Sequence, residues 1–308
     1  MFHVKQSDKA TPKDSFGMDT PLAREIADLS ARRRVLDSVK VEFTGETRVL
    51  TVSNQKGGVG KTTSAVNIAA ALSGLGAKVL VIDLDPQGNA STALGVPHSG
   101  DVPSVYDVLI DEVPLADIVQ QSPEDANLFC APSTIHLAGA EIELVAQVAR
   151  EHRLRRALQD YLESNPMDFV IIDCPPSLGL LTINAFTAAD EVFIPIQCEY
   201  YALEGLSQLL GSIQMIQKHL NPDLHLSTIL LTMFDGRTRL AQQVADEVRT
   251  HFPDQVLDTV IPRSVRVSEA PSFGQTVIAY DGQSAGAVAY REAAVEIASR
   301  TATQSKEK

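Results

Sequence analysis

Short apolar runs alternate with segments of helical periodicity along most of the chain. The segments with apolar residues at helical spacing include 65–75, 153–162 and 287–300. Between them lie runs rich in Val, Ile and Leu with the length of buried strands, at residues 49–52, 78–83, 168–173, 191–197, 228–233 and 256–261. This β-α alternation predicts an α/β fold, a doubly wound and mainly parallel sheet flanked by helices.

The two ends of the chain lack this pattern. The first 46 residues are polar, although Thr20 and Pro21 suit the start of a short helix. We expect a flexible extension over residues 1–46, a single domain over 47–300 and a polar tail over 301–308. The arginines at 32–34 leave a second interpretation open, in which the extension docks on a partner or touches DNA.

Composition narrows the class of protein. The 308 residues are 44% hydrophobic, enough for a substantial core, and the net charge is −13. That charge argues against a protein that coats nucleic acid over its whole surface, but not against a local basic patch. Cys130, Cys174 and Cys198 lie far apart, without the spacing of a zinc site. With no apolar run as long as a membrane span and no signal-peptide core, we expect a cytoplasmic protein.

A glycine-rich loop follows the first apolar run and opens a helical segment. It reads Lys56-Gly57-Gly58-Val59-Gly60-Lys61-Thr62-Thr63. Strand, glycine loop and Gly-Lys-Thr at a helix start form a phosphate-binding loop, in which backbone N–H groups surround phosphate oxygens. We expect Lys61 to reach the β- and γ-phosphates of a bound nucleotide, and the Thr62 hydroxyl to ligate Mg²⁺.

One position departs from the usual G-x-x-x-x-G-K-[ST] pattern. Gln55 stands where a glycine is expected, and Lys56 follows it. A second lysine beside Lys61 is unfavourable unless another negative charge accompanies it. A nucleotide triphosphate, including one bound to a facing subunit, would supply that charge.

Carboxylates stand at the ends of two other predicted strands. Asp83 and Asp85 end one run and begin a turn-rich loop, and Asp173 ends another. Because strand ends hold the chemistry of open α/β sheets, we expect these acids near the phosphate loop. Asp173 would hold Mg²⁺, directly or through a water molecule. The reaction expected is Mg²⁺-dependent ATP hydrolysis.

The loop resembles that of the deviant Walker A ATPases, a superfamily that includes ParA/Soj partition proteins, MinD and the nitrogenase iron protein. Further stretches, 83–89, 137–144 and 198–206, are similar to ParA/Soj proteins, so the resemblance extends over most of the chain. It implies that Asp85 positions the attacking water and that Asp83 supports the Mg²⁺ shell. It also implies that Lys56 reaches the partner's nucleotide across an ATP-dependent homodimer, and that Pro262 and Ser264 contact the adenine. Many relatives carry Asn where this chain has Ser264.

The same resemblance implies that the protein acts on DNA. Arginines matching Arg237 and Arg266 contribute to sequence-independent binding of double-stranded DNA, and Arg239 and Arg263 would extend that patch. A ParB-like centromere-binding protein would stimulate hydrolysis and release the dimer from the nucleoid.

Two other functions stay open at this point. A MinD-type division regulator needs an amphipathic membrane helix, and the polar C-terminal segment argues against one and against membrane binding. A ParA-like protein that positions another cargo would use the same DNA-based mechanism, and only its partner would separate the two, although the stretches 86–89 and 198–206 favour the DNA-partition protein. The iron-protein alternative lacks its cysteine context, although Cys174 follows the strand that ends in Asp173.

Overall fold

The computed structural model describes residues 20–43 and 45–304 of the chain. The chain forms two compact units, residues 1–38 and 39–308. Helix α1 (Pro21–Ser38) belongs to the first unit and begins where the sequence predicts. The Thr20 hydroxyl accepts a hydrogen bond from the Ala23 amide at 3.2 Å, which caps the first turn. The arginines at 32–34 lie inside this helix.

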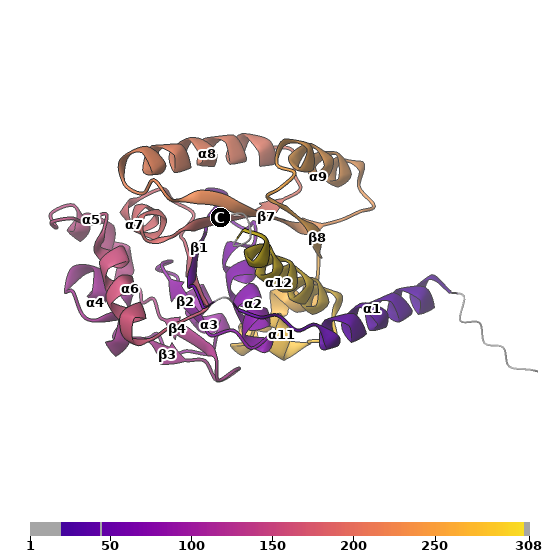
Figure 1. Ribbon diagram of the computed structural model, residues 1–308, viewed down its shortest axis with the longest axis horizontal. Helices are drawn as coiled ribbons and strands as arrows, with labels where there is room; N and C mark the ends of the chain where they lie inside the picture. Colours follow the sequence, from indigo (N-terminus) through magenta and orange to yellow (C-terminus); the bar gives the residue numbers. More distant parts are fainter. Residues whose placement is uncertain (1–19, 44, 305–308) are drawn as a thin grey trace, which may run out of the picture. The chain divides into compact units, whose positions relative to one another are not determined.

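The second unit is built on an eight-stranded sheet (Figure 1). Its strands are β1 (Arg48–Val52), β2 (Val79–Asp83), β3 (Gln120–Gln121), β4 (Leu128–Ala131), β5 (Phe169–Asp173), β6 (Glu191–Gln197), β7 (His225–Phe234) and β8 (Val256–Pro262). Their order is β3-β4-β2-β5-β1-β6-β7-β8, and among the described residues only β3 and β4 pair antiparallel. The predicted α/β class with a mainly parallel sheet is confirmed.

The central strands are buried on both faces, which explains their unbroken apolar runs. Every residue of β2 and β5 is buried, and β1 is buried from its second residue onward. A parallel strand between two helical layers has no solvent face, so its sequence does not alternate between apolar and polar positions. The sheet edge is different: β3 has only two residues, which is too short for any periodicity to predict it.

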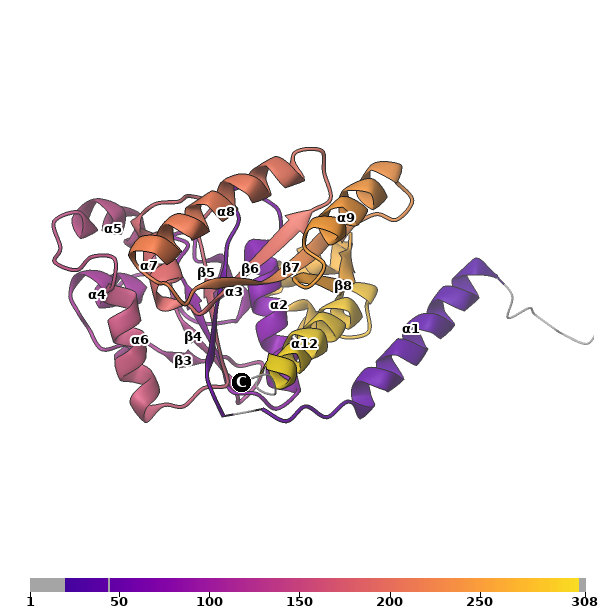
Figure 2. The same ribbon diagram turned by 45° about the horizontal axis from the view of Figure 1, so that its top comes forward.

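Helices cover both faces of the sheet (Figures 1 and 2). One layer contains α2 (Lys61–Gly74), α3 (Asn89–Ala93), α10 (Val265–Glu269), α11 (Val277–Tyr280) and α12 (Ala285–Gln304). The other contains α4 (Val105–Ile110), α5 (Leu137–Leu144), α6 (Arg153–Ser164), α7 (Leu180–Ala188), α8 (Ala202–His219) and α9 (Arg239–His251). Short 3₁₀ turns at Leu115–Asp117 and Ala270–Phe273 complete the two layers.

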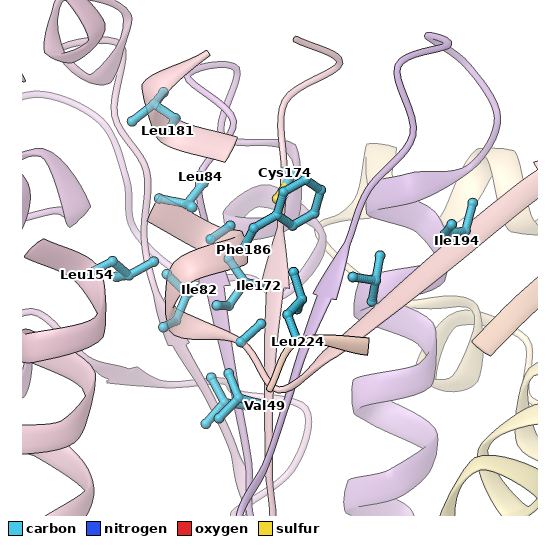
Figure 3. Close-up of a cluster of buried hydrophobic side chains, with 14 of the residues drawn as sticks. Val49, Ile82, Leu84, Leu154, Ile172, Cys174, Leu181, Phe186, Ile194 and Leu224 are labelled. Atoms are coloured by element: carbon cyan, nitrogen blue, oxygen red, sulfur yellow. The ribbon is translucent and has the colours of Figure 1, made fainter. Parts of the chain in front are cut away.

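Each helical layer has its own apolar core against the sheet. Figure 3 shows the layer beneath α6 and α7, where Ile82 and Ile172 of neighbouring strands meet Phe186. In the opposite layer α2 is rich in alanine and almost fully buried, so it packs close to the sheet and to α12. The helix that follows the phosphate loop is therefore held by the sheet on one side and by α12 on another.

The last helix extends beyond residue 300. Helix α12 continues to Gln304, past residue 300, and residues 305–308 lie outside the described part. Among the described residues, no helix has both the length and the apolar character needed to cross a bilayer.

Candidate functional site

The glycine-rich loop joins β1 to α2 at the carboxyl edge of the sheet. Gly58 and Gly60 have φ angles of 75° and 90°, a left-handed conformation that side chains other than glycine rarely adopt. Gly60 is the N-cap residue of α2 and has no side chain to cap it. The first amides of the helix therefore have no side-chain acceptor from the cap, as a phosphate site requires. Gly57 and Gly58 are exposed, whereas Val59 is buried beneath them.

Lys61, the first residue of α2, folds back over the loop. Its Nζ donates to the Lys56 carbonyl oxygen at 3.3 Å, and the residue is only 7% exposed. Burial lowers the pKa of Lys61, while the nearby Asp173 and Asp85 carboxylates act in the opposite direction. A buried ammonium group thus lies between the loop and two strand-end acids.

Asp173 lies at the centre of this edge. The register of the sheet places it beside Val52 of β1 on one side and Asp83 of β2 on the other. It is fully buried, and no described residue makes a hydrogen bond of good geometry to either carboxylate oxygen, although the Thr62 hydroxyl is near enough to lower its pKa. Burial, and then the Asp83 charge, raises the pKa of Asp173 well above its usual value; Thr62 and Lys61 lower it less.

An unpartnered buried carboxylate is unfavourable by itself, so this site fits a bound cation. The Thr62 hydroxyl and Asp173 offer oxygen ligands, the type that Mg²⁺ prefers. Among the residues described, no group of three or more His, Cys, Asp or Glu side chains could hold a metal ion. Mg²⁺ at this position would take its remaining ligands from phosphate and water, which is its usual habit in nucleotide sites.

The Asp83 carboxylate accepts hydrogen bonds from other residues of the chain. Its Oδ2 accepts hydrogen bonds from the Ser91 amide at 2.8 Å and hydroxyl at 2.7 Å, and its Oδ1 accepts one from the Asp85 amide at 3.1 Å. Burial raises the pKa of Asp83 to about 6, and these hydrogen bonds oppose the shift. Asp83 thus holds the loop that carries Asp85, and its support of a Mg²⁺ shell stays a prediction.

Asp85 is half-buried in that loop, where its Oδ1 accepts a hydrogen bond from the Gln87 amide at 3.0 Å. It lies close enough to Lys61 and Asp173 to affect the pKa of each. The residue expected to position the attacking water therefore lies at the site, and that role stays a prediction.

Lys56 pairs with an acid of its own chain. Its ammonium group forms a salt bridge with the Glu199 carboxylate, which follows β6. Both side chains are exposed, at 43% and 44%. The negative charge that the sequence required beside Lys56 is thus supplied here by Glu199, which sequence analysis had not paired with it.

A pocket lies beside the start of α2, next to the phosphate loop. It has a volume of about 120 Å³, and its lining includes Gly60, Thr63, Pro262 and Ser264. The two residues expected to contact the adenine therefore share a pocket with the phosphate loop. Met233 also lines it, with a φ of 50° that is unusual for a residue with a side chain.

Comparison with known proteins identifies the family. The protein-family model described as an AAA domain matches residues 47–226. The chain is 54% identical over 251 residues to the sporulation initiation inhibitor protein Soj of Bacillus subtilis, covering 82% of this chain and 98% of Soj. It is 51% identical over 253 residues to the chromosome partitioning protein ParA of Caulobacter vibrioides, covering 82% and 94%. This chain belongs to the ParA/Soj family.

A solved structure supports the same fold. Cobyrinic acid a,c-diamide synthase from Mycobacterium smegmatis, with bound ADP and magnesium, is 41% identical. The match covers 82% of this chain and 94% of that one, with a TM-score of 0.70. The predicted resemblance to ParA/Soj proteins is confirmed, and so is the P-loop architecture.

Four arginines of this ParA/Soj-family chain gather at one edge of the sheet. Arg237 and Arg239 follow β7, Arg263 and Arg266 follow β8, and all four are exposed. Because β7 and β8 are parallel neighbours whose ends align at Phe234 and Pro262, the two loops emerge together.

Two of these arginines already have acidic partners. Arg237 Nε and Nη2 donate to the two Asp235 carboxylate oxygens, each at 2.9 Å. Arg266 donates to Glu269 at 3.2 Å, and its Nε lies 3.4 Å from Asp281. The basic edge of the ParA/Soj-family domain is therefore partly neutralised by its own acids.

Sequence reasoning missed three contacts that shape the site. Ser91 holds Asp83, Glu199 holds Lys56, and the Thr232 hydroxyl donates to the Val59 carbonyl oxygen at 2.8 Å. Only Glu199 had a signal, since it lies in the stretch similar to ParA/Soj proteins. Ser91 lies only eight positions after Asp83, but no motif marks it as a partner, and the Thr232 contact joins residues 173 positions apart.

Proposed function

We propose that the chain is a Mg²⁺-dependent ATPase that segregates DNA. Its ATP-bound homodimer binds double-stranded DNA without sequence preference, and hydrolysis stimulated by a ParB-like partner releases it. The protein would act in the cytoplasm, associated with the nucleoid. The observation that carries this proposal is the unpartnered, buried Asp173 beside the phosphate-loop lysine, in a chain 54% identical to Soj.

Each part of the site has a role in ATP hydrolysis. The amides of residues 57–63 and the Lys61 ammonium bind and orient the phosphates. Thr62 and Asp173 would hold Mg²⁺, which supplies charge neutralisation at the phosphates when bound. Asp85 orients the attacking water, and Pro262 and Ser264 border the base. Catalysis of this kind rests on positioning and charge rather than on a covalent intermediate.

Lys56 makes dimer formation depend on the nucleotide. In a single chain Glu199 neutralises it, so Lys56 has no need of a partner. A triphosphate bound to a facing subunit offers more negative charge than one carboxylate does. ATP therefore favours exchange of the Glu199 pair for a contact across the dimer, and hydrolysis reverses that exchange.

DNA binding is proposed for the edge formed by Arg237, Arg239, Arg263 and Arg266. Contacts to phosphates give affinity without sequence information and are weakened by salt. The net charge of −13 disfavours binding of DNA over the whole surface, so a local basic edge is needed.

The alternatives have less support. The Mycobacterium structure is described as a synthase, but the relatives described as Soj and ParA are more similar in sequence. A role with an iron–sulfur cluster is disfavoured because Cys174 is fully buried, and burial raises its pKa to about 12. A ParA-like protein for another cargo remains the second candidate, and its partner would distinguish it.

The test is binding to random-sequence duplex DNA with ATP, with ADP and without nucleotide, over a series of salt concentrations. We expect DNA binding in the presence of ATP but not with ADP or without nucleotide. The affinity should fall steeply as the salt concentration rises. Absence of binding in every state, with ATP turnover intact, would refute the DNA-segregation function and leave only the ATPase.

A further inference from the structure

A cavity of about 370 Å³ opens beside Asp85 and has no assigned role. Four segments line it: the loop after β2, helix α5, the loop after β5, and the start of α7. The residues that matter here are Asp85, Ala138, Glu141, Pro176 and Leu181. The complete lining includes two carboxylates but no lysine, arginine or histidine.

Glu141 of α5 is the unusual residue in this wall. Its Oε1 is buried and has no hydrogen-bond partner among the described residues. The carboxylate packs against the backbone of Gly179, where an added Cβ would collide with it. A buried carboxylate oxygen without a donor is unfavourable, so Glu141 would gain from a cation placed in the cavity.

Exposed apolar residues of α5 and of the turns at its two ends form a stripe that reaches this cavity. Ile135, Ile142 and Val145 are 68%, 79% and 59% exposed, and Ala138 lies between them at helical spacing. Aliphatic side chains gathered on one exposed helix face mark an interaction surface more often than chance. Ala138 belongs both to the stripe and to the cavity wall, so the two features form one surface.

We propose that this surface, made of the α5 stripe and the cavity, docks the partner that stimulates hydrolysis. The partner segment would place aliphatic side chains on Ile142 and Val145 and insert one lysine or arginine toward Glu141. The apolar stem of such a side chain suits Pro176 and Leu181, and its charge suits the two carboxylates. This inference rests on the proposed function and adds to it the site and the chemistry of the partner.

The position explains how docking would affect hydrolysis. A cation in the cavity faces Asp85 as well as Glu141, and Asp85 is the proposed water-positioning residue. The walls also include Pro175 and Pro176, which follow the strand that ends in Asp173. The partner would thus act on the hydrolytic side of the site without contacting the phosphate loop.

The experiment measures ATP turnover of the full chain against increasing concentrations of the ParB-like protein from the same genome, with DNA present. Ile142→Asp and Glu141→Gln are the test variants. Matched controls are Met215→Asp, another exposed apolar residue on α8, and Glu163→Gln, an exposed acid on α6. Unstimulated turnover, ATP-dependent dimerisation and DNA binding are measured for each.

We expect both test variants to need at least tenfold more partner for half-maximal stimulation, with the other three properties and both controls unchanged. A charge exchange sharpens the result: Glu141→Lys should lose stimulation, and one Lys→Glu or Arg→Glu substitution in the partner should restore it.

Two results would overturn the proposal while the proposed function stands. One is full stimulation of both test variants; the other is loss of the dimer in Ile142→Asp, which would assign the stripe to a contact between two copies. Absence of stimulation in the wild-type chain would instead overturn the partner-dependent function, and this inference with it.

Discussion

Two charged residues at the nucleotide site differ in how well the protein satisfies them. Lys56 has a partner in Glu199, whereas the buried oxygens of Asp173 have none. Lys56 can leave Glu199 for another anion at a small cost in free energy, because both side chains of the pair are exposed. The second fits an added cation, so each residue points to a different test.

Lys56→Ala is expected to abolish partner-stimulated turnover, because the variant cannot reach the nucleotide of a facing subunit. Steady-state ATPase measurements with and without partner and DNA check this outcome. The loop backbone is unchanged, so binding of ATP to the single chain should persist. Unchanged stimulated kinetics would refute the role given to Lys56.

Glu199→Gln is expected to promote dimerisation at lower ATP concentration, since it removes the competitor for Lys56. An exposed ion pair is worth about 0.2–1 kcal/mol, so the shift should not exceed about fivefold. Light scattering over an ATP titration measures it, with Glu204→Gln on the following helix as a control. A shift toward higher ATP would show that Glu199 supports the dimer instead.

Asp173→Asn tests the metal site by its response to magnesium. The wild-type chain should gain thermal stability from ATP with Mg²⁺, and EDTA should remove most of that gain. In the variant, the difference between Mg²⁺ and EDTA should be much smaller, because the neutral amide is a weaker Mg²⁺ ligand than the carboxylate. A full Mg²⁺ response in the variant would argue against Asp173 as a ligand.

At the level of elements, one ion pair joins three parts of the domain. Arg48 of β1 donates to both Glu191 carboxylate oxygens at 2.6 and 2.8 Å, and to the Ile297 carbonyl oxygen of α12 at 2.8 Å. The two side chains are 13% and 8% exposed. The pair fixes the starts of β1 and β6, and therefore the strand that carries the phosphate loop.

Glu191→Gln is expected to lower the free energy of unfolding by about 2–3 kcal/mol, slightly below the range for fully buried pairs. Burial raises the pKa of Glu191, but the Arg48 hydrogen bonds and charge outweigh it and hold the pKa below its usual 4.5. This stabilisation is present above pH 4.5 and is lost as the pH falls through the lower, folded-state value.

Urea unfolding at pH 7 and at pH 3.5 measures both effects. The difference between wild type and Glu191→Gln should shrink at the lower pH, while the exposed control Glu163→Gln should match wild type at both. An equal difference at the two pH values would mean that Glu191 contributes by packing and not by charge.

The sequence predicted the elements well where burial determined composition. The run at 191–197 corresponds to β6 (Glu191–Gln197), and the Asp83 and Asp173 strand ends lie where expected, because buried parallel strands need unbroken apolar runs. Helix α7 was not predicted, since its buried positions include Thr182, Asn184 and Thr187 as well as apolar residues, so its sequence has no amphipathic period. The Lys56–Glu199 pair joins residues 143 positions apart, and such a contact follows from topology alone.

On the scale of the whole molecule, an acidic protein is proposed to bind an acidic polymer. The net charge of −13 repels DNA, so the local edge at Arg237 and Arg266 has to overcome a general repulsion. Asp235 and Glu269 weaken this edge further by pairing with the same arginines. The DNA hypothesis can therefore be tested by removing an arginine, which should lower the affinity for DNA, and by removing one of these acids, which should raise it.

Arg237→Glu and Arg266→Glu are each expected to lower the affinity of the ATP-bound protein for duplex DNA several-fold and to reduce the salt dependence, because fewer phosphate contacts form. Asp235→Asn is expected to raise the affinity, because it releases Arg237 from its bidentate partner and removes a negative charge from the edge. Arg156→Glu, an exposed arginine on α6 away from the β7 and β8 ends, serves as the charge-matched control. Filter binding at several salt concentrations measures all four variants, with ATP-dependent dimerisation checked in parallel.

If Arg156→Glu lowers the affinity as much as Arg237→Glu does, net charge and not this edge governs binding. Opposite effects of Arg237→Glu and Asp235→Asn, with Arg156→Glu close to wild type, would instead assign the contact to the Arg237 guanidinium group.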